Sequence, residues 1–184
     1  YLNKILETEN VDYVLASDTD SLYVTFDSLV QKVGLTDTNK IIEFMDKVCE
    51  GKIQDVIDGC YGEMAEYVNA FQQKMVMKRE VLAEVGIWTG KKHYILNVHN
   101  SEGVQYDEPK LKIMGIEAVK SSTPEPCRNA LKKAMKIMMN GTEDDVINYI
   151  EEFKTKFKTL HAEEVSFPRS VKGLAKYHDS ASIY

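Results

Sequence analysis

Two short apolar stretches flank an acidic segment near the start of the chain. The segment is Asp18-Thr19-Asp20-Ser21. Its flanks are rich in β-branched and aromatic residues, namely Val11, Tyr13, Val14 and Leu15 before it and Leu22, Tyr23, Val24 and Phe26 after it. Such flanks are typical of strands, whereas Asp, Thr and Ser favour turns. The pattern predicts a β-hairpin with two acids at its tip.

The hydrophobic pattern becomes helical after this hairpin. Apolar residues recur at helical spacing from Ile41 to Phe71, and residues 37–39 offer capping side chains before them. Gly51, Gly59 and Gly62 interrupt the apolar stripe, and glycine weakens a helix interior. We therefore expect either one long bent helix or two helices in succession.

Between residues 74 and 112 the pattern changes to the alternation of strands. Met75 and Met77 alternate with the residues beside them, and Lys91 to Val98 is a further candidate strand. Residues 104–106 could pair with that strand through a turn at residues 100–103. We expect a small antiparallel sheet in this region.

The pattern is helical again in the last third of the chain. Ser122, three residues before Glu125, resembles a capping box that opens one helix, and Thr142 with Asp145 opens a second. The predicted fold class is therefore α+β. An antiparallel sheet with packed helices is expected in residues 1–120, and a partial helical part is expected in residues 121–184.

Composition narrows the classes of protein that fit this pattern. The net charge of −6 argues against a DNA clamp spread over the whole surface, although local basic patches are compatible with it. Three widely spaced cysteines fit no zinc or disulfide pattern and favour a reducing, cytoplasmic setting. No apolar run reaches membrane-spanning length. Because the first residue is not Met, we expect a piece of something longer.

Asp18 and Asp20 form the first candidate site. Side chains alternate along a strand, so two acids one residue apart could point the same way. Carboxylates held close together repel each other unless a cation neutralises them, and Mg²⁺ is usually held by one or two carboxylates while substrate phosphates complete its shell. The alternative is that each Asp caps its own turn.

Several segments together resemble one family. Asp18-Thr19-Asp20-Ser21 resembles motif C of the family B DNA polymerases. Lys78-Arg79-Glu80 resembles a later palm strand, and Lys91-Lys92-His93-Tyr94 resembles the K-K-x-Y element that contacts the primer end. Residues 108–115 and 120–124 resemble the passage from palm to thumb in polymerases of large tailed phages. The four elements occur in the family's order, and the resemblance fades after residue 160.

The resemblance implies a metal-assisted nucleotidyl transfer with two Mg²⁺ ions. It places Asp20 as a direct metal ligand, Asp18 as a weaker or outer contributor, and Glu80 as a third carboxylate nearby. For Glu80 the alternative is a surface residue paired with a neighbouring cation. The implied partners are primer-template DNA, a dNTP, the N-terminal part of the polymerase, and a sliding clamp in the full enzyme.

The resemblance also implies what lies outside this chain. The family's first metal-binding Asp and its nucleotide-binding Lys helix precede motif C, so we expect the chain to be inactive alone. Two departures from the family pattern fall near the site. Ala16-Ser17 stands where relatives have Tyr-Gly, and Lys78 stands where close phage relatives have an acid.

The lysines are candidate DNA contacts. Strand alternation would place Lys92 and Tyr94 on one face, with Lys91 on the other, and donors there could reach minor-groove acceptors that every base pair presents. Lysines at positions 110, 112 and 120 could follow the phosphates. The alternatives are an ordinary edge strand and a solvated helix face.

Two other functions are compatible with the residues. An apolar strand followed by D-x-D also resembles the haloacid-dehalogenase phosphotransferases, in which Asp18 would be the nucleophile. A duplex-binding module without enzymatic activity is the third hypothesis, because the lysines alone would suffice for it.

Overall fold

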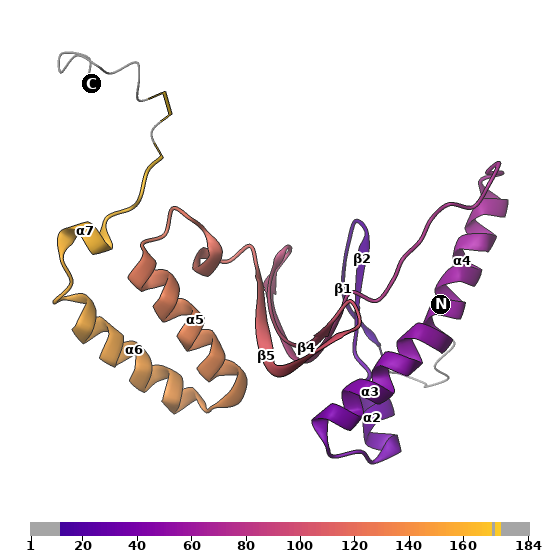
Figure 1. The fold of residues 1–184 in the computed structure, drawn as a ribbon, viewed down its shortest axis with the longest axis horizontal. Coiled ribbons are helices and arrows are strands. Elements are labelled where there is room, and N and C mark those ends of the chain that lie inside the picture. The colour runs from indigo at the N-terminus through magenta and orange to yellow at the C-terminus, as the bar shows by residue number, and fades with distance from the viewer. Residues whose placement is uncertain (1–11, 171, 174–184) are drawn as a thin grey trace. The chain divides into compact units, whose positions relative to one another are not determined.

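The computed structural model describes residues 12–170, 172 and 173 (Figure 1). Helices and antiparallel sheets are mixed along the chain, which confirms the predicted α+β class. The chain divides into two compact units. The first takes in the chain up to Lys92 together with Leu96–Lys112, and the second takes in His93–Ile95 and the chain from Ile113 onward.

The predicted hairpin is present in the first unit. Strand β1 (Val14–Asp18) pairs antiparallel with β2 (Ser21–Val24), and Asp18 lies opposite Ser21. The turn consists of Thr19 and Asp20 alone, so it is shorter than the four-residue segment suggested. The register shifts between Val14 and Ala16, which marks a β-bulge near the base of the hairpin.

A series of helices follows the hairpin. Helix α2 (Asp27–Val33), which the sequence analysis did not predict, ends at Gly34 in the left-handed conformation. Helix α3 (Thr38–Val48) is capped by the Asp37 carboxylate, which accepts the Lys40 N–H at 2.9 Å. A π-helical turn (Cys49–Ile53) then leads directly into α4 (Gln54–Tyr67). Because the residues at both junctions keep right-handed helical angles, the helical backbone is continuous from Thr38 to Tyr67, which corresponds to the single long helix of the two expected arrangements.

A second, three-stranded sheet has the strand order β3-β4-β5. The strands are β3 (Val81–Gly90), β4 (His93–Ser101) and β5 (Val104–Met114), and two-residue turns join them, as antiparallel neighbours allow. The turn predicted at residues 100–103 is confirmed, with Glu102 and Gly103 between β4 and β5. The central strand β4 is buried from Tyr94 to Asn100.

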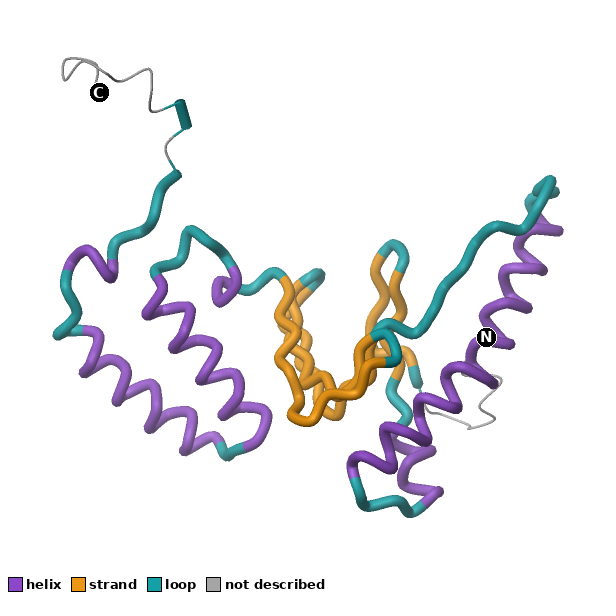
Figure 2. The backbone as a smooth tube through the Cα atoms, viewed as in Figure 1, coloured by secondary structure: helices purple, strands orange, loops and turns teal. Residues whose placement is uncertain are grey.

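Residues 73–80 differ from the prediction. Met75 and Met77 lie in an irregular segment before β3, not in an alternating strand, and Figure 2 shows this segment as a loop between α4 and β3. Side chains satisfy its backbone groups where a neighbouring strand would otherwise do so. Gln73 bonds to the Met75 backbone, and the Gln54 side chain of α4 donates to the Met77 carbonyl at 2.9 Å.

The second unit is mainly helical. After a 3₁₀ turn (Glu117–Val119) come α5 (Glu125–Asn140), α6 (Glu143–Phe157) and the short α7 (Ala162–Val165). The capping box of Thr142 and Asp145 opens α6 as predicted. The box expected at Ser122 is wrong, because Pro124 is the N-cap of α5 and no side chain caps that helix. None of the described helices has both the length and the apolar character needed to cross a membrane.

Candidate functional site

The tip of the β1–β2 hairpin carries the first two candidate residues. Asp18 is the last residue of β1, and its Oδ1 accepts the Thr19 N–H at 3.0 Å and the Thr19 hydroxyl at 3.2 Å. Its other oxygen, Oδ2, lies 3.0 Å from the Nζ of Lys92. The bond from Lys92, with smaller contributions from Thr19, lowers the pKa of Asp18 and keeps it ionised at neutral pH.

Asp20 occupies the turn beside it. Its side chain is exposed, and no other described residue forms a hydrogen bond or an ion pair with its carboxylate. The expectation that Asp18 and Asp20 share a face rested on strand alternation. Because β1 ends at Asp18, alternation does not relate the two side chains. The hairpin tip thus carries Asp18, which is paired with Lys92, next to Asp20, which has no cationic partner among the residues that the structure describes.

Glu80 lies just before β3, one residue outside the strand on which it was expected. Its side chain forms an ion pair with Lys112 of β5, and its carbonyl accepts the Glu102 N–H at 2.7 Å. The cation that it contacts is therefore a lysine on β5, not its neighbour Arg79. Glu80 is therefore held by a backbone hydrogen bond from Glu102 and a side-chain ion pair with Lys112.

The three candidate carboxylates do not form a closed metal site by themselves. Within the residues that the structure describes, no three His, Cys, Asp or Glu side chains are grouped closely enough to hold a metal ion. A site at the hairpin tip would thus consist of Asp18 and Asp20 with further ligands from elsewhere.

The K-K-x-Y residues adopt a different geometry from the predicted strand. Lys91 and Lys92 form the turn between β3 and β4, and Lys92 has a left-handed backbone with φ of 61°. Tyr94 lies in β4 and is only 7% exposed. The predicted alternation of Lys92 with Tyr94 is therefore wrong, because the strand begins at His93. The structure instead brings Lys92 to Asp18, a contact that no local sequence pattern indicates.

The other candidate lysines also have partners. Lys110 lies 3.9 Å from the centre of the Tyr106 ring, Lys112 pairs with Glu80, and Lys120 lies 2.7 Å from a Glu117 oxygen. Exposed contacts of this kind contribute little to stability, so they can be exchanged for a phosphate at small cost.

Comparison with known proteins gives relatives for most of the chain. Residues 6–155 match the family model described as divergent family B DNA polymerase. The DNA-directed DNA polymerase of Escherichia phage RB69 is 41% identical over an alignment that covers 96% of this chain and 21% of the relative. The DNA-directed DNA polymerase of Enterobacteria phage T4 is 34% identical, with 97% of this chain and 21% of the relative covered. The chain spans about a fifth of the length of these two relatives.

Proposed function

This chain belongs to the divergent family B DNA polymerases, and from this premise we propose that it supplies part of the nucleotidyl-transfer site of a longer DNA polymerase. The observation that carries the proposal is the hairpin tip, where two acids lie in a two-residue turn and its preceding strand, within the segment that the family model matches. The family membership sets aside the phosphotransferase alternative.

In this proposal residues 1–120 are the C-terminal part of the polymerase palm, and residues 121–184 begin the thumb. Helices α2 to α4 and the β3-β4-β5 sheet would support the hairpin, and α5 and α6 would belong to the thumb. The chain alone would be inactive, because a further metal-binding Asp and the nucleotide-binding residues belong to the remaining part of the polymerase.

Asp20 and Asp18 are the residues that would hold Mg²⁺, with Glu80 as a further carboxylate of the site. The donor set fits this ion, since Mg²⁺ commonly takes one or two carboxylates and completes its shell with phosphate oxygens and water. The exposed Asp20 carboxylate has no competing partner among the described residues, which supports its assignment as the direct ligand. Bound Mg²⁺ would supply a lowered pKa at the primer 3′-hydroxyl and charge neutralisation at the transferred phosphate.

Lys91 and Lys92 are the donors that the primer end would meet first, because they are exposed in the β3–β4 turn whereas Tyr94 is buried. Lys92 holds Asp18 in the structure and would turn to the minor groove when DNA binds. Lys110, Lys112 and Lys120 would contact phosphates and add salt dependence without sequence preference.

The test is primer extension with a separately produced N-terminal portion of the polymerase. We expect no extension by this chain alone, Mg²⁺-dependent extension by the mixture, and a loss of at least about a hundredfold with Asp20→Asn, since a direct metal ligand contributes several kcal/mol to the transition state. Asp27→Asn is the matched control, because Asp27 is an exposed acid in the first turn of α2. Full extension with Asp20→Asn, or none with any mixture, would contradict the proposal.

A further inference from the structure

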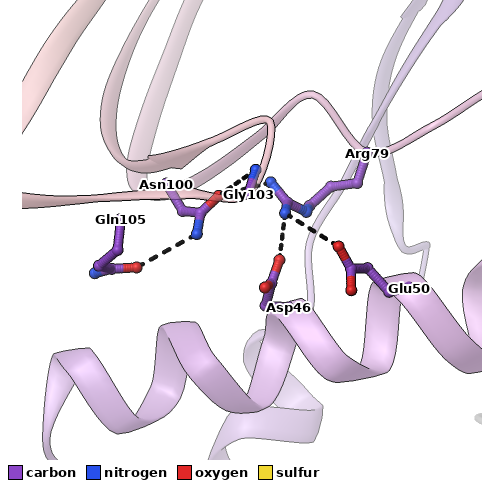
Figure 3. A network of polar contacts seen from close by, with 6 residues as sticks. All are labelled: Asp46, Glu50, Arg79, Asn100, Gly103 and Gln105. Atoms are coloured by element: carbon purple, nitrogen blue, oxygen red, sulfur yellow. Dashed lines mark hydrogen bonds and ion pairs between the residues drawn. The ribbon is translucent and has the colours of Figure 1, made fainter.

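Arg79, which directly precedes the candidate Glu80 in the sequence, lies at the centre of a polar cluster (Figure 3). Its Nη1 donates to the Asn100 side chain at 2.8 Å, and its Nη2 contacts Asp46 of α3. Glu50, in the π-helical turn, lies 3.9 Å from the same Nη2. The Arg79 side chain is only 10% exposed, whereas the side chains of Asp46 and Glu50 are 26% and 66% exposed, so the cluster is shielded from water mainly on the arginine side.

Asn100 completes the cluster on the side of the sheet. It accepts the Gly103 N–H at 3.2 Å and donates to the Gln105 side chain at 3.4 Å, so it holds the β4–β5 turn closed. The oxygen that accepts from Gly103 also accepts from Arg79. Arg79 therefore joins α3 and the π-helical turn that directly follows it to the end of β4, which is distant from both in sequence.

Within the described part of the chain, no strand pairs with the segment around Arg79. Residues 73–80 are irregular, and the bonds that fix their last part are few. The Met77 carbonyl accepts from Gln54, Arg79 forms its cluster, and the Glu80 carbonyl accepts the Glu102 N–H. Because Glu102 belongs to the same β4–β5 turn that Asn100 closes, the Arg79 cluster and the Glu80 backbone bond depend on one turn.

The residue type suits this task. The planar guanidinium presents donors in fixed directions and can bond to Asn100 and Asp46 at the same time. The single amine of a lysine lacks this fork and would bond to one of them. We infer that Arg79 is a positioning residue, which fixes the backbone at Glu80 and thereby holds the Glu80 carboxylate beside Lys112 for the polymerase reaction. The inference rests on the proposed function only for the role of Glu80 in that reaction.

The first test follows the Glu102 amide by NMR-detected hydrogen exchange in the chain itself. We expect Arg79→Met and the milder Arg79→Lys to speed this exchange at least about tenfold by local opening, while the Arg128 amide of α5 keeps its rate. Lys47→Met is the matched control, because it removes an exposed charge next to Asp46. If Arg79→Met does not fold, Arg79→Lys decides. An unchanged Glu102 rate in the folded variant would overturn the inference.

The second test uses the reconstituted polymerase and separates positioning from mere folding. Arg79→Lys should raise the Mg²⁺ concentration for half-maximal extension about tenfold, the size of a lost supporting contact at a metal site. In a Glu80→Gln background the same substitution should add nothing, because its effect passes through the Glu80 carboxylate. Equal losses in both backgrounds would overturn the inference. If the wild-type mixture fails to extend primers, the proposed function fails, and the exchange test still decides whether Arg79 positions Glu80.

Discussion

The hairpin tip and the Arg79 cluster both join a carboxylate to a cation, and they do so in opposite ways. At the tip, the Lys92 side chain is 61% exposed and meets Asp18 at one point. In the cluster, Arg79 is 10% exposed and contacts Asp46, Glu50 and Asn100 together. An exposed pair contributes little and exchanges partners easily, whereas a buried pair is costly to break from one side. The first arrangement suits a site that must accept ligands, and the second suits a fixed support.

The largest expected effect is therefore on stability in the cluster. Arg79→Met should lower the free energy of unfolding by about 3 kcal/mol, because it leaves Asp46 without its donor and removes one of the two donors to the Asn100 oxygen. The value lies at the low end for a buried pair for two reasons. The Asp46 side chain is 26% exposed, and the Nε of Arg79 already lacks a partner among the described residues. Urea denaturation followed by circular dichroism measures the loss.

The control for this variant is Lys47→Met, which removes a neighbouring exposed charge and should change stability by less than about 0.5 kcal/mol. Equal stability of the Arg79→Met and Lys47→Met variants would mean that the Arg79 cluster contributes no more to stability than an exposed charge does.

Asn100→Ala should have the next largest effect. It deprives Arg79 and the Gly103 N–H of their shared acceptor, and Asn100 is only 3% exposed, so a loss of about 1–2 kcal/mol is expected. Asn140→Ala is the matched control, since Asn140 is exposed and bonds only to a carbonyl of its own helix among the described residues. A loss as small as that of the control would mean that the β4–β5 turn does not need Asn100.

A smaller effect should appear in thiol chemistry beside the cluster. Cys49 is 8% exposed, and burial raises the pKa of its thiol, with Arg79 opposing the rise and Asp46 adding to it. We expect iodoacetamide to modify Cys49 at least about tenfold more slowly than the half-buried Cys60 and Cys127 at pH 8, because the thiolate is the reactive form. The Cys49 rate should still increase above pH 9. Peptide mass spectrometry measures all three rates, and equal rates would show that the Cys49 thiol is accessible to water.

Local patterns predicted much of the fold because their physics is local. The hairpin, the Asp37 cap of α3, the Thr142–Asp145 box and the β4–β5 turn all depend on residues within a few positions of each other. The errors arose where distant partners decide the structure. Residues 73–80 alternate in sequence, yet side-chain bonds to α3, α4 and the sheet hold them in an irregular path.

The candidate site shows the same division. Motifs indicated which acids and lysines to examine, but they did not indicate that Lys92 meets Asp18 or that Lys112 meets Glu80. Those pairs depend on how the β3–β4 turn and strand β5 are placed. Arg79 was part of a recognised motif, and its role as a link between helix and sheet became visible only with the contacts of Asp46 and Asn100.

The smallest effect on stability is expected at the hairpin tip, where the loss of the ion pair should cause no measurable change. Lys92→Met should leave the midpoint of thermal unfolding unchanged, because water can replace each partner of an exposed ion pair at little cost in free energy.

The same variant should raise the pKa of Asp18 toward the usual 3.8, since the bond from Lys92 is the main cause of its lowering. A lowered pKa in the folded chain means that this attraction is present above pH 3.8 and is lost as the pH falls through the lowered pKa. An NMR titration of the Asp18 carboxyl carbon measures the shift, with Lys110→Met as the control because Lys110 stacks on Tyr106 instead. A marked drop in the unfolding midpoint with Lys92→Met would show that the tip is as firmly built as the cluster.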